Sequence, residues 1–480
     1  MLIMNYTTLR KEKFRMKSAK DLQKELTFSV DHISRTHPEM WEKSQEFCEA
    51  YKEFLSVCKT EREAVSHVIK MAQANGYTEY NPEKTYKAGD KVYLNNRNRA
   101  LILSTIGQLT VDNGTHIVAS HIDVPRLDLK PNPLYEASEL SYLKTHYYGG
   151  VKRYQWAVTP LALHGVIYKE DGSFVEINVG EDENDPVFCI SDLLPHLSKD
   201  QRERKMNDVL LGEEMNVIVG SLPFVDEDGE DVKEAVKLAT LVYLNEKYGI
   251  TEKDFLRAEV EVVPAGKARD VGFDRSMVGG YGHDDRVCAY TSVVAELETK
   301  NPTKTTVTIL ADKEEIGSTG ATGLQADYLK NFITNLAMMQ GVNYLTALQN
   351  SKCLSADVGA AYDPTFASAY EANNSCYLNK GAVLTKYTGS GGKGGTNDCG
   401  AEFMAEMIAL FDSKGVCWQS QELGKIDQGG GGTVARFVAE CDITTVDIGV
   451  AVMSMHAPFE IVSKLDVYAT YEAFAAFINR

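Results

Sequence analysis

Apolar residues follow a helical spacing in the first part of the chain and form strand-like runs after it. Between about Ser18 and Asn75 they recur every three or four positions, which places them on one face of a helix. These positions include Trp41, Phe47, Tyr51, Phe54 and Leu55. Gly76 ends the pattern, and two short apolar runs follow, Ala100 to Ile106 and His116 to Ser120. The pattern predicts a helical start and then two strands.

From Asp284 onward, apolar runs of strand length alternate with segments of helical spacing. The predicted strands are Thr305 to Ala311, a run ending near Asp357, Ala382 to Tyr387, and Thr445 to Val452. The predicted helices are Arg286 to Glu296, Ala326 to Leu336, Cys399 to Leu410, and Leu465 to Ile478. Such alternation is typical of an α/β fold with a doubly wound mixed sheet, in which ligands bind at the carboxyl ends of the strands.

Residues 127–265 have a different order of predicted strands, loops and helices, and we interpret them as an inserted α+β, β-rich module. The module is predicted to contain strands at Trp156 to Tyr168 and Phe174 to Val179, an acidic loop at Glu181 to Asp185, and helical segments near Ser191 and Val232. Residues 1–126 and 266–480 share one order of strand, loop and helix, so we expect them to form one discontinuous domain. A long decorated loop is the alternative, although unstructured loops of this length are uncommon.

Composition and charge exclude several classes of partner. The chain has 480 residues, enough for two or more domains, and its formal net charge of -18 argues against nucleic acid or an anionic membrane as a partner. No apolar run is long enough to span a membrane, and no signal peptide is recognisable. The nine cysteines are dispersed without a Cys-x-x-Cys pair, which favours reduced thiols and a cytoplasmic location.

Five apolar runs end in residues that can bind a metal ion. The residues are His121 with Asp123, Asp284, Glu314 with Glu315, Asp357, and His456. Imidazoles combined with carboxylates suit zinc, cobalt or manganese. Each residue alone has a plainer explanation, such as a helix N-cap for Asp284 or a solvated acidic turn for the two glutamates. Adjacent residues of an extended segment point to opposite sides, so one glutamate can hold a metal while the other moves a proton.

Several motifs together resemble the aspartyl aminopeptidase family, the M18 metallopeptidases. The motifs are Ala119 to Leu127, His283 to Arg286, Asp312 to Ser318, Ser355 to Asp357, and Met455 with His456, in the family's order. Tyr148 to Gly150, Trp156 and Leu161 to Gly165 also resemble the family's inserted domain, and the resemblance covers the chain from about Ser18 to its end.

The resemblance implies a site with two divalent metal ions, with zinc first and cobalt or manganese as alternatives. Asp284 would bridge both ions, His121 and Asp357 would complete one, and Glu315 and His456 the other. Asp123 would fix the tautomer of His121. Glu314 would be the general base that activates water for removal of the N-terminal residue of a peptide.

The resemblance also implies a preference for acidic N-terminal residues, Asp or Glu, and a homo-oligomer, often a dodecamer built from dimers through the inserted domain. Lys386, Lys393 and Lys425 are the candidate countercharges for an acidic substrate. His196 lies in a segment that resembles one reaching a neighbouring active site, but Asp200 stands where a second histidine is expected.

Two departures leave alternatives open. Asp285 replaces the asparagine of many family members and is closer to the M42 aminopeptidases, which implies a broad or neutral specificity.

Gly389 to Gly394 matches Gly-x-Gly-x-x-Gly, so a nucleotide-binding protein is a second alternative, although the resemblance makes this loop and Gly429 to Gly432 active-site loops. An assembly protein that has lost activity is a third. His-Glu-x-x-His and Gly-x-Ser-x-Gly are both absent from the sequence, which disfavours a one-zinc helix-based protease and a serine hydrolase.

Overall fold

The larger part of the molecule is built on a mixed sheet of nine strands. A computed structural model describes residues 17–225 and 232–480. The strands lie in the order β1 (Thr78–Glu79), β2 (Lys91–Asn96), β3 (Ala100–Thr105), β14 (Thr306–Ala311), β4 (His116–His121), β15 (Lys352–Ala356), β19 (Thr444–Gly449), β17 (Ala382–Thr385) and β18 (Trp418–Gln421). The central four, β14, β4, β15 and β19, are parallel, so their carboxyl ends lie along one edge.

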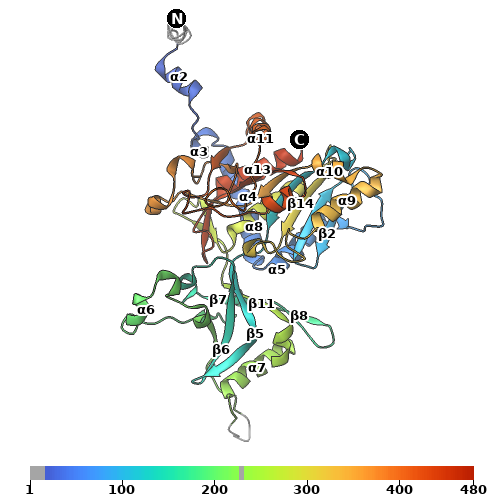
Figure 1. Ribbon diagram of the computed structural model, residues 1–480. Helices are drawn as coiled ribbons and strands as arrows, with labels where there is room; N and C mark the ends of the chain where they lie inside the picture. Colours follow the sequence, from blue (N-terminus) through green and yellow to red (C-terminus); the bar gives the residue numbers. More distant parts are fainter. Residues whose placement is uncertain (1–16, 226–231) are drawn as a thin grey trace.

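Helices cover both faces of this sheet (Figure 1). One face packs against α4 (Met40–Val57), α5 (Glu61–Ala74), α8 (His283–Leu297), α11 (Ala401–Lys414) and α13 (Lys464–Ile478). The other face packs against α9 (Tyr328–Gln340), α10 (Tyr344–Gln349) and α12 (Ala435–Ala439). Within β4, Val118 belongs to the first core and its neighbours Ile117 and Ala119 belong to the second, as the alternation of a strand requires. The predicted mixed α/β fold is confirmed.

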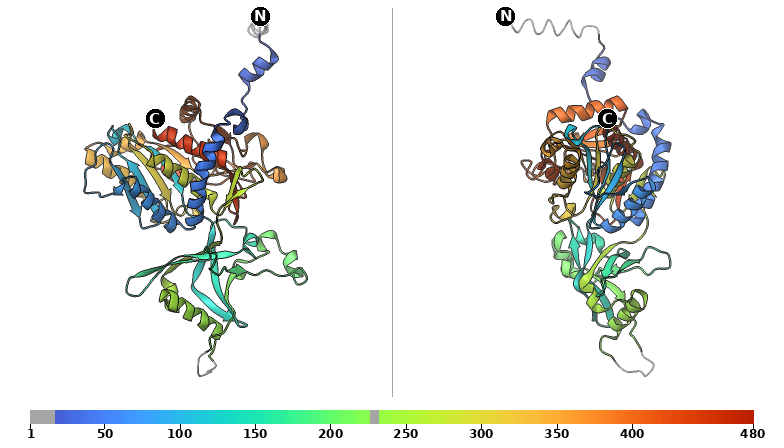
Figure 2. Two further views of the ribbon diagram at one scale, coloured as in Figure 1. Left: turned by 180° about the vertical axis from the view of Figure 1, so that it is seen from behind. Right: turned by 90° about the vertical axis from the view of Figure 1, so that its right-hand side faces the viewer.

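A second sheet has seven strands, paired antiparallel throughout. Their order is β8 (Phe174–Val179), β7 (Leu161–Tyr168), β11 (Ala258–Pro264), β5 (Arg126–Ala137), β6 (Leu140–Tyr148), β10 (Asn216–Gly220) and β9 (Cys189–Ile190). Helix α7 (Ala235–Tyr248) packs on it, and the two views of Figure 2 place this sheet in a lobe beside the larger part. All of its strands come from residues between Arg126 and Pro264.

A third, small sheet connects elements from the middle of the chain with elements near its end. Its strands are β12 (Arg269–Val271), β13 (Met277–Gly280), β21 (Glu460–Ser463), β20 (Ala451–Met453) and β16 (Gly359–Ala360). The predicted strand Thr445 to Val452 is in fact two strands, because the chain leaves the nine-stranded sheet at Val450 and enters this one. The change of sheet directs the segment after β20 toward the edge where the parallel strands end.

The remaining predicted elements fit with three corrections. The strand predicted from Trp156 begins only at Leu161, because Val158 has a φ of 56° and Pro160 has no N–H to pair. The segment near Ser191 is not helical, and the next helix is the short α6 (Lys199–Glu203). The helical start is divided into α2 (Ala19–Leu26), α3 (Ile33–Thr36), α4 and α5. The long β5–β6 hairpin was not predicted.

Among the described residues, no helix combines the length and apolar character needed to cross a membrane. All nine cysteines carry free thiols. The second observation agrees with the expectation of reduced cysteines.

Candidate active site

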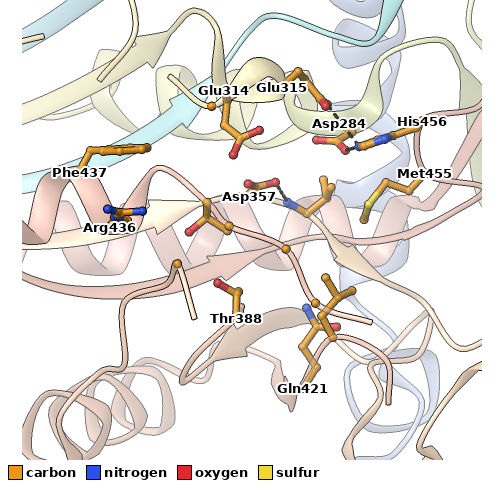
Figure 3. Close-up of a pocket in the computed structure, with 18 of the residues that line it drawn as sticks. Asp284, Glu314, Glu315, Asp357, Thr388, Gln421, Arg436, Phe437, Met455 and His456 are labelled. Carbon is orange, nitrogen blue, oxygen red and sulfur yellow. Dashed lines mark hydrogen bonds and ion pairs between the residues drawn. The ribbon is translucent and has the colours of Figure 1, made fainter. Parts of the chain in front are cut away.

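The five predicted ligand positions meet at the edge where the parallel strands end. His121 is the last residue of β4, Asp357 follows β15 directly, and Glu315 lies in a single 3-10 turn shortly after β14. Asp284 lies at the start of α8, and His456 follows β20. Figure 3 shows Asp284, Glu315, Asp357 and His456 around one cavity. Because β14, β4 and β15 are neighbours, residues far apart in the sequence become close at this edge.

Asp284 lies between the two histidines, with one carboxylate oxygen near each. His121 Nε2 is 3.2 Å from Asp284 Oδ1, and His456 Nε2 is 3.1 Å from Asp284 Oδ2. His456 Nε2 is also 3.4 Å from Glu315 Oε1, and His121 Nε2 is 3.9 Å from Asp357 Oδ1. The side chains therefore form two groups that share Asp284.

The donor atoms fit metal ions. His121, Asp284 and Asp357 place one ligand atom each within 4.8 Å of one another, and so do Asp284, Glu315 and His456. A third group, His121 with Glu314 and Glu315, meets the same limit. Asp284 Oδ1 and Glu315 Oε1 are buried without a hydrogen-bond partner. Buried carboxylate oxygens need a compensating charge or donor, and a cation supplies it.

Burial changes the protonation of the carboxylates in the absence of a cation. It raises the pKa of Glu314 to about 7 and the pKa values of Glu315 and Asp357 well above their usual range. Burial acts in the same direction on Asp284, but the imidazoles of His121 and His456 close to its carboxylate outweigh that effect and lower its pKa. The nearby carboxylates repel one another, so the cluster favours cation binding over an empty, fully ionised state.

Asp123 holds the loop that carries the two glutamates. Its Oδ1 accepts a hydrogen bond from the backbone N–H of Glu314 at 3.1 Å, and its Oδ2 accepts one from the N–H of Glu315 at 3.2 Å. His121 Nδ1 lies 2.9 Å from the carbonyl oxygen of Asp123 and 3.4 Å from Oδ1 of its carboxylate. A proton on Nδ1 leaves Nε2 free to face Asp284. The nearer of these two contacts is thus with the main chain of Asp123, and the carboxylate lies farther away.

Two residues to which the sequence analysis gave no role in the site support this arrangement. Glu460, buried at the start of β21, accepts hydrogen bonds from the backbone N–H of Asp284 at 3.1 Å and of His456 at 2.6 Å. The His456 backbone has a φ of 65°, a conformation that costs free energy in a non-glycine residue. Tyr148 donates a hydrogen bond to Asp123. Glu460 binds the backbone of two candidate ligands, and Tyr148 binds Asp123 instead of a ligand. A search of the sequence for residue types that bind metals therefore does not find them.

Asp285 follows Asp284 and is fully buried. Its Oδ2 accepts a hydrogen bond of 3.3 Å from the backbone N–H of His121. Burial raises the pKa of Asp285 well above its usual range, which favours the neutral acid. A neutral carboxylic acid resembles an amide in its hydrogen bonding more than a carboxylate does, so an aspartate at this position changes the local chemistry less than its residue type suggests.

The cavity, of about 550 Å³, is lined by the carboxylates, by Gly430 to Gly432, and by Thr388 and Gly395, which flank the other glycine-rich loop. Gly389 N–H donates a hydrogen bond of 2.6 Å to the Gly431 carbonyl, and a Cβ on Gly430 would lie 1.8 Å from the Gly389 carbonyl oxygen. This contact requires glycine. Helix α11 begins only at Ala401, well after Gly394, whereas a dinucleotide fingerprint leads directly into a helix. The nucleotide-binding alternative therefore has no support from this loop.

The four residues predicted to bind substrate lie outside the cavity. Lys393 Nζ is 3.0 Å from Asp398 Oδ2, and Lys425 Nζ donates a hydrogen bond of 2.7 Å to the Ser368 carbonyl. Lys386 and His196 are exposed. None of the four is among the described residues that line the cavity.

Comparisons with known proteins identify the family. Residues 54–478 match the family model described as aminopeptidase I zinc metalloprotease (M18). The probable M18 family aminopeptidase 1 of Clostridium acetobutylicum is 52% identical over 437 residues, which are 89% of this chain and 93% of that protein. The corresponding Thermotoga maritima protein is 43% identical, over 92% of this chain and 98% of the relative.

Two solved structures are similar throughout. The crystal structure of aminopeptidase I from Clostridium acetobutylicum matches with a TM-score of 0.89 at 47% identity, over 95% of this chain and all of that one. That of the M18 aminopeptidase from Thermotoga maritima matches with a TM-score of 0.89 at 41% identity, over 94% of this chain and all of that one. This chain is a member of the M18 family of zinc metallopeptidases and is an aminopeptidase.

Proposed function

We propose that this aminopeptidase uses two divalent metal ions, held by the side chains that meet at Asp284, to remove N-terminal residues from peptides. The observation that carries the proposal is the position of Asp284 between His121 and His456, with one oxygen about 3 Å from each imidazole. His121 and Asp357 would complete one ion, and Glu315 and His456 the other. Zinc is the metal in the description of the family.

Bound at these ligands, two cations would lower the pKa of a water molecule and polarise the scissile carbonyl. Glu314 lies beside the ligands and lines the cavity, with Oε2 4.0 Å from His121 Nε2. Figure 3 shows the carboxylates of Glu314 and Glu315 pointing to different parts of the site, and that of Glu315 lies toward Asp284 and His456. This difference supports Glu314 as the general base, which takes a proton from water and passes it to the leaving amine.

The proposal includes the finer features that the family resemblance implies. These are a preference for acidic N-terminal residues and a doubly wound catalytic domain of residues 1–126 and 266–480. A third is a dimerisation or lid domain of residues 127–265 that joins the chains of a homo-oligomer. The mApe1 dodecamer of S. cerevisiae shares the fold, with a TM-score of 0.73 at 20% identity. Exposed Leu193, Leu194 and Leu197 around His196 support an interface on the second sheet's lobe. A cytoplasmic location stays a prediction.

The first experiment measures hydrolysis of Asp-, Glu-, Leu- and Lys-anilides after chelation and after zinc, cobalt or manganese is restored. Metal-restored cleavage of the Asp and Glu substrates is expected. Cleavage of the Leu substrate alone would keep the metal site and favour the broad-specificity alternative. An absence of cleavage with every metal would favour an assembly protein without activity.

Glu314→Gln tests the base in the same assay. General acid–base catalysis contributes about a hundredfold or more, so turnover should fall by at least that factor while the metal content is unchanged. Glu246→Gln, on the exposed side of α7, is the control and should be as active as the natural protein. Unchanged turnover of Glu314→Gln would exclude Glu314 as the base.

A further inference from the structure

Arg436 is the one arginine or lysine among the described residues that line the cavity. It lies in the short helix α12, shortly after Gly430 to Gly432 and next to Phe437, which lines the same cavity. In Figure 3, Arg436 and Phe437 lie at the end of the cavity where Glu314 is found, away from His456 and Met455. The position places a permanent positive charge beside the site where a peptide would be cleaved.

Arg436 has hydrogen-bonding capacity that its neighbours do not use. Its Nε donates a hydrogen bond of 3.0 Å to Glu440 Oε1, and both side chains are about half exposed, 50% and 58%. Its two terminal nitrogens donate no hydrogen bond to any residue in 17–225 or 232–480. This exposed pair occupies only Nε, so it leaves the terminal nitrogens available to a ligand. The edge formed by the two terminal nitrogens matches the geometry of a carboxylate.

The charges of the site favour a negatively charged ligand at this end of the cavity. The lining carboxylates of Asp284, Glu314, Glu315 and Asp357 would be balanced by two divalent ions. Arg436, whose pair with Glu440 uses only Nε, would then still have two terminal nitrogens without a partner among the described residues at the cavity wall. Lys393 and Lys425 do not line the cavity, and their ammonium groups contact Asp398 and the Ser368 carbonyl.

We propose that Arg436 binds a carboxylate of the peptide in the active site and thereby determines which peptides are cleaved fastest. The inference rests on the proposed function, because it assumes that the peptide lies in this cavity. The carboxylate has two sources, the side chain of an acidic N-terminal residue and the α-carboxylate of a dipeptide. Both present the same planar pair of oxygens to the guanidinium.

The experiment compares Arg436→Gln and Arg436→Lys with the natural protein, each loaded with metal and verified for metal content. One arm measures the ratio of kcat/KM for Asp-anilide to that for Leu-anilide. The other measures the ratio for Leu-Gly to that for Leu-Gly-amide, which lacks the α-carboxylate. Lys393→Gln is the matched control, since it removes one positive charge, also paired with a carboxylate, from the neighbouring glycine-rich loop at a position that does not line the cavity.

Loss of a charge-assisted hydrogen-bond pair should lower one of these ratios about tenfold or more in Arg436→Gln, mainly through KM. Arg436→Lys should keep the charge and lose only part of the effect. A lower Asp-to-Leu ratio assigns the acidic side chain as the source, and a lower Leu-Gly ratio assigns the α-carboxylate. Calorimetric binding of the non-hydrolysed aspartate and leucine hydroxamates provides a second measurement that does not depend on turnover.

The inference is overturned if neither ratio and neither binding constant changes in Arg436→Gln, or if Lys393→Gln changes them equally. Its failure can be separated from failure of the proposed function. Metal-restored cleavage of Leu-anilide by all variants would keep the proposed function and remove only the role of Arg436. Loss of that cleavage in the natural protein with every metal would remove the proposed function itself.

Discussion

The hydroxyl of Tyr148 donates a hydrogen bond of 2.7 Å to Oδ2 of Asp123. Tyr148 ends β6 in the seven-stranded sheet, whereas Asp123 follows β4 of the nine-stranded sheet. The Asp123 carboxylate also accepts the backbone N–H groups of Glu314 and Glu315. The second sheet thus contributes directly to the position of the two glutamates.

Tyr148→Phe should lower kcat about tenfold with little change in KM or metal content. The substitution removes one donor from a fully buried carboxylate, which costs about 1–3 kcal/mol, and it weakens the support of the loop that carries Glu314. Steady-state kinetics with Leu-anilide and elemental analysis of the metal measure both effects. Tyr147→Phe is the matched control, because Tyr147 is the exposed neighbour on the same strand. Equal kinetics for the two variants would contradict a positioning role for Tyr148.

Glu460→Ala should weaken metal binding about 10- to 100-fold, the range measured when residues behind metal ligands are removed. Glu460 fixes the backbone of Asp284 and His456, and without its carboxylate both N–H groups would lose their acceptor. Glu460→Gln keeps one acceptor oxygen, so its affinity should be intermediate. Competition with a chelator of known affinity measures the change, and Glu472→Ala, in the following helix, is the control. Unaltered metal affinity in Glu460→Ala would refute the role.

His456→Ala should bind about one metal ion per chain instead of two. The substitution removes a donor from the group with Asp284 and Glu315 and leaves the group of His121, Asp284 and Asp357 intact. Elemental analysis after dialysis gives the stoichiometry. His146→Ala, an exposed histidine of β6, should keep the natural content. Two ions per chain in His456→Ala would remove His456 from the proposed site.

The sequence predicts that the candidate ligands lie close together, and for three of them the reason is topological. His121, Glu315 and Asp357 follow parallel strands that are neighbours in one sheet, so residues with no proximity in the sequence meet at its edge. The break of the predicted Thr445 to Val452 strand at Val450 did not disturb this prediction. His456 still reaches the edge, through the small sheet that β20 joins.

Residues that act through the main chain or from an unexpected element were not predictable in this way. Glu460 begins a strand and binds two backbone N–H groups, and nothing in the sequence distinguishes it for this role from other acidic residues. Tyr148 ends a hairpin strand that contains many polar residues, so the pattern of apolar residues does not predict the strand. Arg436 lies on a helix of five residues, where a charge paired with Glu440 four residues later is typical of a solvated surface. Their significance depends on three-dimensional neighbours.

A buried carboxylate far from the metal ligands should make stability depend on pH. Glu296 in α8 is fully buried and accepts hydrogen bonds at Oε1 from the hydroxyls of Tyr77, Thr105 and Thr306, at 2.8 to 3.0 Å. Oε2 accepts one from Thr308 at 3.3 Å. None of these partners carries a positive charge, and burial raises the pKa of Glu296 to about 7 from an ordinary value of 4.5.

The folded state therefore holds a proton on Glu296 between pH 4.5 and about 7 that the unfolded chain has released. Stability from this group is fully present below pH 4.5, falls as the pH rises, and is lost above about 7. At about 1.4 kcal/mol per pH unit, the loss is about 3 kcal/mol. In Glu296→Gln, whose side chain does not titrate, this part of the pH dependence should disappear.

Urea unfolding at pH 5, 6, 7 and 8, at one protein and metal concentration, measures the effect. The free energy of unfolding of the natural protein relative to Glu296→Gln should decrease from pH 5 to about pH 7 and then level off toward pH 8. Glu246→Gln should follow the natural protein, since its carboxylate is exposed in the folded and unfolded states alike. Parallel curves for the natural protein and Glu296→Gln would mean that the four hydroxyls stabilise the ionised carboxylate well enough to cancel the cost of its burial.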